Sequence, residues 1–400
     1  MTSGRGLSRR NVLGIGAAVS SAGVLPMAVG SAPAAAAVGT DEDVGGQRLA
    51  FFGDHQPGIE TVPQAQATLV GLDLHDGQGP ADVQRLLRIW TDDAARLVDG
   101  SGALADNEVE LSHLPANLTV TFGFGWSFFD RLGLQHRRPD ALVRYPELPN
   151  DRLDPAWSDG DLLVHVASDD PLTTSHAARV LVRDARTFAR PRWVQRGFRR
   201  AVGVADASAP RNLMGFVDGT VNPQPGTADF ANVVWAADGP DWFVGGTTLA
   251  LRRIEMNLSA WERFDRSGRE LILGRRLADG APLTGGSETT APDLTATNDL
   301  GLPVIPDDAH IALAHARNPR ERFLRRGWNY DDTMNTGSSA GAGLLFCAYQ
   351  ADMGRQLLPV QRRLAGRDPL NRWTSAVGSS VFAIPPGCSE GSTIGEGLLS

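Results

Sequence analysis

The hydrophobic pattern after residue 66 alternates between strand-like and helix-like periods, and the order of these segments restricts the folds open to the chain. Runs of apolar and β-branched residues predict strands, whereas apolar residues at helical spacing predict amphipathic helices. The strands predicted in the first half are 67–74, 118–124, 161–167 and 193–202, and the helices are 81–98 and about 171–189. The order strand, helix, strand, strand, helix, strand is that of a ferredoxin-like unit.

The second half shows a similar order of segments. Its predicted strands are 244–253, 310–316, 323–330, 343–350 and 380–384, and its predicted helices are 258–264 and 353–365. A chain of 400 residues is long enough for two modest domains. We therefore predict an α+β fold of two ferredoxin-like halves, 47–210 and 211–395, in which antiparallel sheets carry peripheral helices.

The N-terminus has the pattern of an export signal. Three arginines without any acidic residue precede a weakly apolar stretch at 12–25, and alanines at 35–37 offer a cleavage site, so the signal is predicted to span 1–37. The segment SRRNVL at 8–13 resembles a twin-arginine signal, which addresses folded proteins; a Sec signal with a chance arginine pair is the alternative. We expect export by the twin-arginine route to the cell envelope, the periplasm or the extracellular space.

The composition excludes several classes of protein. All 38 basic residues are arginine, so P-loop, pyridoxal-phosphate and Schiff-base chemistry, which need lysine, are ruled out. The net charge of −8 becomes more negative without the signal, which argues against nucleic acid and anionic membranes as partners. No apolar run reaches the roughly 18 residues of a membrane span. Cys347 and Cys388 are compatible with one bridge outside the cell or with free thiols.

Asp218 lies in the most informative segment, 214–223, where glycines, an asparagine and a proline mark a turn-rich loop. On this stretch alone, an aspartate that caps its own turn is the simpler interpretation. The segment 322–330 combines arginines with apolar and aromatic residues. An arginine run is usually solvated, but this context favours a buried functional arginine.

His310 and His315 suggest a metal site, but their spacing argues against a shared ion. Five residues apart, they face opposite sides of a strand, or lie about 140° apart on a helix. The chain also lacks an HExxH motif and paired CxxC motifs. A single histidine can instead ligate a haem iron.

Five segments together resemble those of a known family. They are FGDHQPGI at 52–59, GFVDG at 215–219, His310, LRRG at 324–327 and GLLF at 343–346. In this order and at this spacing they resemble the dye-decolorizing peroxidases, and especially the exported deferrochelatase-like branch. The resemblance runs across essentially the whole mature chain.

The resemblance implies a dimeric α+β barrel type of fold, one haem b per chain and a site in the second half. It implies that Asp218 is the distal acid–base group, Arg325 the distal cation and His310 the proximal iron ligand. His315 would bond a haem propionate or be a surface histidine. A carboxylate is expected on the other ring nitrogen of His310, and no motif identifies it. The remaining haem contacts implied are Gly219, Thr220, Val221, Arg275, Arg317 and Arg325.

The function implied is the reduction of hydrogen peroxide with oxidation of bulky aromatic donors such as dyes and phenols. Expected partners are these substrates and the twin-arginine machinery; a homo-oligomer is left open. Trp328, Tyr330 and Tyr349 are candidates for an electron relay, with core packing as the simpler interpretation. One alternative is a haem-binding protein of iron acquisition. Another is a serine hydrolase, because GSSAG at 337–341 formally fits GxSxG, although the strand-before, helix-after context is missing.

Overall fold

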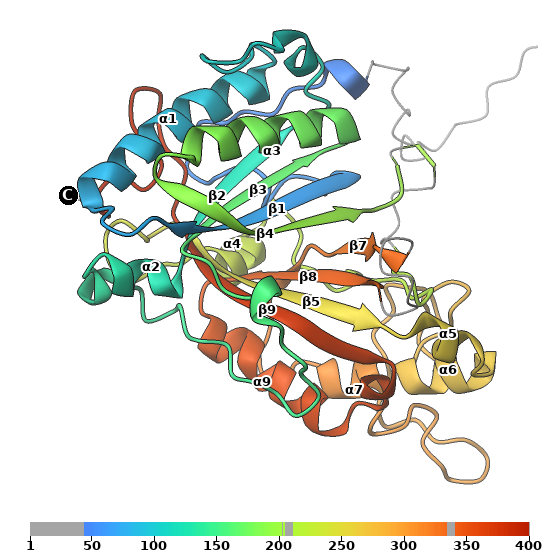
Figure 1. Ribbon diagram of the computed structural model, residues 1–400. Helices are drawn as coiled ribbons and strands as arrows, with labels where there is room; N and C mark the ends of the chain where they lie inside the picture. The colour runs from blue at the N-terminus through green and yellow to red at the C-terminus, as the bar shows by residue number, and fades with distance from the viewer. Residues whose placement is uncertain (1–43, 202, 205–210, 334–340, 400) are drawn as a thin grey trace, which may run out of the picture. The chain divides into compact units, whose positions relative to one another are not determined.

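The computed structural model describes residues 44–201, 203–204, 211–333 and 341–399 (Figure 1). The predicted export signal at 1–37 lies outside these ranges, as does most of the GSSAG segment. Among the described helices, none is long and apolar enough to cross a membrane. Cys347 and Cys388 are both buried free thiols.

The first half is a four-stranded antiparallel sheet with two long helices on one face (Figure 1). The strands lie in the order β2, β3, β1, β4. Trp90 of the first helix stacks on Phe122 at 5.0 Å and donates its indole N–H to the Leu181 carbonyl, which joins both helices to the sheet. The elements are β1 (Gln66–Leu74), α1 (Pro80–Asp99), β2 (Thr119–Gly125), β3 (Leu162–Ser168), α3 (Pro171–Ala185) and β4 (Ala189–Phe198).

The second half is built on three long antiparallel strands in the order β9, β5, β8, with two short strands along the other edge of β8. Helices α7 and α9 lie on the outer face of this sheet (Figure 1). The strands are β5 (Thr247–Met256), β6 (Leu324–Arg325), β7 (Trp328–Asp331), β8 (Ala342–Gln350) and β9 (Thr374–Ile384). The helices are α4 (Ala228–Val234), α5 (Leu258–Glu262), α6 (Arg266–Leu273), α7 (His310–Ala314) and α9 (Met353–Arg367).

Strands of the two halves pair with each other at two places. Strand β2 pairs with β9, and β4 pairs with β7 at Phe198 and Asn329. Within the described residues this produces one nine-stranded sheet, which closes on itself because β5 pairs with both β8 and β9. Apolar side chains from both halves, including Leu69, Leu163 and Leu345, fill the space between the facing layers. The end of β4 is thereby held beside β7.

Most of the predicted strands and helices are confirmed to within a few residues. The last strand begins at Thr374 rather than at 380, and the segment 323–330 is divided into the short strands β6 and β7. One further segment has the wrong type of structure. Residues 310–316 were expected to form a strand, but they contain helix α7. The apolar run is too short for its period to separate the two structures. The contacts of this segment with α9 favour the helix over the strand. The short helices α4, α6 and α2 (Trp126–Arg131) were not predicted.

Candidate functional site

A cavity of about 430 Å³ lies between the second-half sheet and the helices α7 and α9. Strands β5 and β8 supply apolar side chains to one wall, and α9 supplies them to another. Most residues singled out from the sequence line this cavity: Asp218, Gly219, Thr220, Val221, Arg275, His310, His315 and Arg325. Arg317 does not line it; this residue is exposed, and its backbone N–H donates to Glu321 Oε2 at 3.1 Å.

His310 is the first residue of α7 and is held by a carboxylate far along the chain. Its Nδ1 lies 2.6 Å from Asp368 Oδ2, and the other oxygen of Asp368 accepts the backbone N–H of Leu370 at 2.9 Å. Burial by itself lowers the pKa of His310, but the charge and hydrogen bond of Asp368 outweigh it, so the pKa is raised. Because Nδ1 is engaged, Nε2 is the nitrogen that can bind a metal.

Asp368 is therefore the carboxylate that no motif identified. It lies 58 positions after His310, at the C-terminal cap of α9. The acids next to His310 in sequence are Asp307 and Asp308, and Asp307 instead pairs with Arg367 at 2.8 Å. In the local sequence, Asp368 is recognisable only as a helix-capping residue before Pro369. Nothing in that pattern predicts a contact with His310.

We expect Asp368→Asn to weaken the site about 10- to 100-fold in haem affinity or activity, because partners of a metal-binding histidine set its orientation and basicity. The amide can still accept the N–H of Leu370, so folding should be preserved. Haem affinity by absorption titration and the rate of reaction with peroxide are the measurements. Asp307→Asn is the matched control, since it removes an exposed ion pair. Equal behaviour of the two variants would contradict this role of Asp368.

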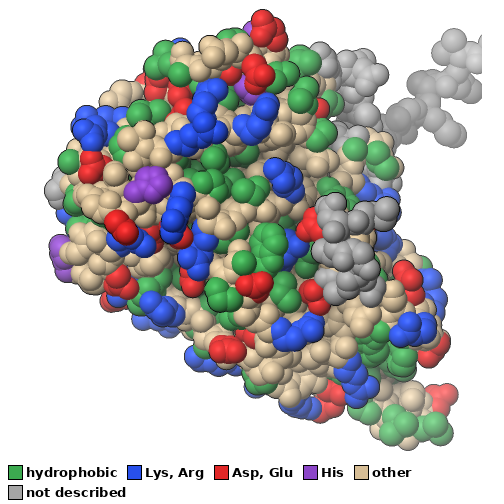
Figure 2. Space-filling model, in the orientation of Figure 1, with side chains coloured by type: hydrophobic (Ala, Val, Ile, Leu, Met, Phe, Trp, Pro, Cys, Tyr) green, Lys and Arg blue, Asp and Glu red, His purple; other side chains and the backbone are tan. Residues whose placement is uncertain are grey.

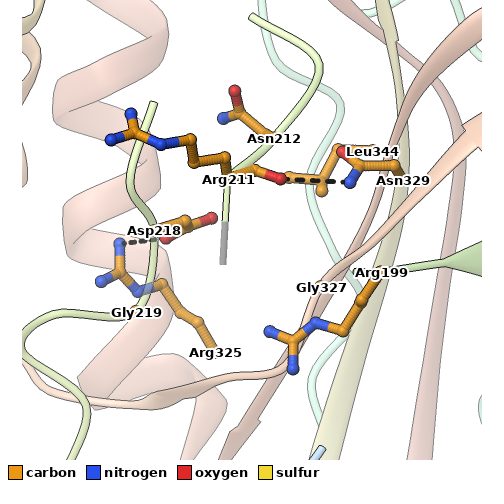
Figure 3. Close-up of a pocket in the computed structure, with 9 residues that line it drawn as sticks. All are labelled: Arg199, Arg211, Asn212, Asp218, Gly219, Arg325, Gly327, Asn329 and Leu344. Atoms are coloured by element: carbon orange, nitrogen blue, oxygen red, sulfur yellow. Dashed lines mark hydrogen bonds and ion pairs between the residues drawn. The ribbon is translucent and has the colours of Figure 1, made fainter. Parts of the chain in front are cut away.

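Asp218 and Arg325, which also line the cavity, form an ion pair with Arg325 Nη1 3.3 Å from Asp218 Oδ1 (Figure 3). Their side chains are about one-quarter exposed, which leaves both reachable by a small substrate. Asp218 is presented by a tight loop in which Gly215 and Gly219 take left-handed backbone angles of +89° and +90°. Only glycine adopts such angles without strain, so both positions serve the loop.

Asn222 positions the backbone of Arg325, a role that sequence reasoning missed. Its side-chain N–H donates to the Arg325 carbonyl at 2.7 Å, and its oxygen accepts the Arg325 N–H at 3.0 Å. The Asn222 amide thus makes the same two hydrogen bonds to Arg325 that the backbone of a neighbouring strand would make. The sequence placed Asn222 in the informative loop, but only as a turn marker.

A third group of side chains lies beside Thr220. The Thr220 hydroxyl donates to Glu288 at 3.0 Å, and Arg275 Nη1 donates to the carbonyls of Gly280 and Glu288. The pKa of Arg275 is lowered, mainly because the side chain is buried. The charge of Glu288 opposes this decrease, whereas the charge of Arg325 adds to it. Arg275 remains a cation here. With Arg325 it can offset the negative charge of a bound carboxylate.

The residues present fit a haem. Apolar walls from β5, β8 and α9 suit a flat, largely apolar ring, and the arginines suit its carboxylates. His310, with Nδ1 engaged by Asp368, would supply a nitrogen ligand for its iron. In the described part of the chain, no cluster of three or more His, Cys, Asp or Glu side chains could hold a metal ion, so the cavity offers His310 no protein co-ligands.

Trp328, Tyr330 and Tyr349 are buried in the apolar cluster between the two layers of the sheet. Trp328 donates its indole N–H to the Gln64 carbonyl, and Tyr349 contacts the buried His165 at 3.1 Å. None of the three reaches the surface. Their environment is that of core packing, the simpler of the two interpretations from the sequence.

Comparisons with known proteins show the family of the chain. Residues 56–199 match the family described as Dyp-type peroxidase, N-terminal, and residues 209–389 match Dyp-type peroxidase, C-terminal. The chain is 38% identical to a dye-decolorizing peroxidase of Thermobifida fusca (strain YX), over 100% of this chain and 98% of that protein. It is 33% identical to a deferrochelatase of Escherichia coli O6:K15:H31 (strain 536 / UPEC), over 98% of this chain and 97% of the relative.

A solved DyP-type peroxidase from Cellulomonas bogoriensis superposes with a TM-score of 0.86 at 48% identity, covering 89% of this chain and 99% of that one. The likeness therefore extends over both halves of the fold, whose ferredoxin-like α+β character is confirmed. The chain belongs to the Dyp-type peroxidase family of haem enzymes.

Proposed function

We propose that this chain is a haem-dependent peroxidase that reduces hydrogen peroxide and oxidises bulky aromatic donors such as dyes and phenols, with one haem b per chain. The observation that carries the proposal is that the Asp218–Arg325 pair and His310 line the same cavity. A carrier needs the histidine but has no need of an acid–base group beside a fixed cation. The dye-decolorizing relative from Thermobifida fusca supports the same activity.

A haem bound in this cavity supplies the iron at which the oxygen–oxygen bond of peroxide is cleaved and through which donors are oxidised. Asp218, as a carboxylate, accepts a proton from one peroxide oxygen and returns it to the other, which departs as water. Arg325 stabilises the negative charge on the departing oxygen. Its backbone is held by Asn222 and its side chain by Asp218, so the charge is in place beforehand.

His310 would hold the iron of a bound haem. Its Nδ1 proton is directed to Asp368, which leaves the lone pair of Nε2 free to bind a metal. We propose that Gly219, Thr220 and Val221 contact the haem, together with Arg275, His315 and Arg317. The first five of these line the cavity. Arg317 would reach the haem only from its exposed position.

Steady-state turnover tests the proposal. The haem-loaded protein is expected to oxidise an anionic dye and a neutral phenol with peroxide faster than an equal concentration of free haem. The two donors separate chemistry from the repulsion of anions by a negatively charged chain. A haem-binding protein of iron acquisition would bind haem but oxidise donors no faster than free haem, and this outcome would reject the peroxidase.

We also propose that the protein is exported by the twin-arginine route to the cell envelope, the periplasm or the extracellular space. The support is the segment at 8–13 within the predicted signal 1–37. We likewise propose that the chain divides into two halves, 47–210 and 211–395. This division rests on the repeated order of elements in β1–β4 and β5–β9.

A further inference from the structure

A small hollow of about 20 Å³ adjoins the Asp218–Arg325 pair (Figure 3). It shares Asn212, Asp218, Gly219, Arg325 and Leu344 with the large cavity, so it lies beside the distal pair. A space of about 10–15 Å³ is the minimum for one water molecule. The hollow therefore suits a ligand of water or peroxide size and excludes an aromatic donor.

Arg199 lines this hollow although it belongs to the first half of the chain. It directly follows β4, whose Phe198 pairs with Asn329 of β7, and its own backbone N–H donates to the Ala65 carbonyl at 2.7 Å. The guanidinium lies over the ring of Trp328, 5.7 Å from its centroid. Figure 3 shows it directed toward the side of the pocket that holds Arg325 and Asp218.

The Arg199 guanidinium is without a hydrogen-bonding partner in the described part of the chain. Its Nε is buried and unpaired, and no carboxylate among the residues that the structure describes lies within ion-pair distance. Arg211, which also lines the hollow, donates instead to the carbonyls of Gly215, Leu277 and Ala278. Burial lowers the pKa of Arg199, and Asp218 is the first group that opposes this decrease.

A partly buried donor without a partner loses the free energy of its hydration and gains no protein bond in return. In folded proteins such donors are rare, and each calls for an explanation, which a ligand can provide. Here the unpaired N–H groups of Arg199 border a hollow of peroxide size, which is lined mainly by polar residues. Arg325 is already engaged by Asp218, so among the described residues that line the hollow, Arg199 is the cation that remains available to a ligand.

We propose that Arg199 is a second distal guanidinium, which binds hydrogen peroxide in the hollow and orients it against Asp218. The inference rests on the proposed peroxidase function. The N–H groups of Arg199 would donate to one peroxide oxygen, while Asp218 would accept the proton of the other. Two arginines facing one carboxylate also make the hollow a binding place for small anions.

The test compares Arg199→Gln with Arg199→Lys and with Arg200→Gln. Arg200 is the next residue, is exposed and lines neither the hollow nor the cavity, so its variant carries the same change of net charge. The first measurement is the second-order rate constant for peroxide by stopped-flow. The second is the Kd of fluoride for the haem-loaded protein by absorption titration, with imidazole as a neutral control ligand.

Arg199→Gln is expected to slow the reaction with peroxide about 10- to 100-fold, the size of one lost charge-assisted hydrogen bond. It should weaken fluoride binding in the same direction and leave imidazole binding and haem content unchanged. Arg199→Lys should recover part of both losses. Arg200→Gln should match the wild type.

Unchanged fluoride affinity in Arg199→Gln would overturn the inference, even if the peroxide rate fell, because the residue would then act through its packing on Trp328. Unchanged values of both quantities would overturn it as well. If the wild type itself fails to react with peroxide, the proposed function is rejected. The fluoride titration then still decides whether Arg199 is a ligand-binding group.

Discussion

Replacing His310 by alanine is expected to yield a folded protein with little bound haem. Among the residues that line the described cavity, His310 is the histidine whose ring is oriented by a carboxylate, through the 2.6 Å bond to Asp368. Loss of its imidazole would remove the nitrogen that we propose as the protein's ligand to the haem iron. The ratio of Soret to protein absorbance after purification measures the effect.

His315→Ala is the matched control for this experiment. His315 follows α7, is exposed and borders the same cavity, but no carboxylate orients its ring in the described structure. We expect this variant to retain haem at the wild-type level. Equal haem content in both variants would show that the assignment of His310 is wrong.

Asp218→Asn and Arg325→Leu are each expected to keep their haem and to react far more slowly with peroxide. Removal of an acid–base group typically costs about 10²- to 10⁴-fold in rate. Loss of a preformed charge stabiliser costs about 10²- to 10³-fold. The two groups are paired at 3.3 Å, so the effects of the single variants should not add in the double variant. Stopped-flow spectra of the haem band on mixing with peroxide give the rates.

Asp92→Asn and Arg96→Leu serve as controls with the same changes of charge. Asp92 and Arg96 form an exposed pair on α1, at 3.0 Å, away from the cavity. Exposed pairs of this kind contribute little. Wild-type rates are therefore expected in both control variants. Wild-type rates in the Asp218 and Arg325 variants as well would refute their distal roles.

Features encoded within short stretches could be predicted from the sequence. Apolar runs located the strands β1–β5, β8 and β9, and apolar residues at helical spacing located the helices α1, α3 and α9, because both patterns follow directly from the burial of these elements. The glycines around Asp218 marked a turn-rich loop, and in the structure Gly215 and Gly219 adopt left-handed backbone angles there. Motif order then proposed Asp218, His310 and Arg325, and all three line one cavity.

The sequence patterns gave wrong predictions where two local structures fit the same pattern equally well. The five residues of α7 have an apolar run too short to show a period, so their helix depends on contact with α9. Residues 323–330 were expected as one extended segment, but the structure has two short strands, β6 and β7, on either side of Arg326 and Gly327. In both segments, the contacts with neighbouring helices or strands determine the local structure.

The sequence alone thus determined most of the order of elements and proposed the reactive side chains, because both inferences depend on residues close together in the chain. The tertiary structure alone decided which groups hold those side chains. Asp368 reaches His310 across 58 positions, and Asn222 reaches Arg325 across 103. Arg199 joins the pocket only because β4 pairs with β7. Such contacts arise from the packing of whole elements, and no local periodicity or turn chemistry encodes them.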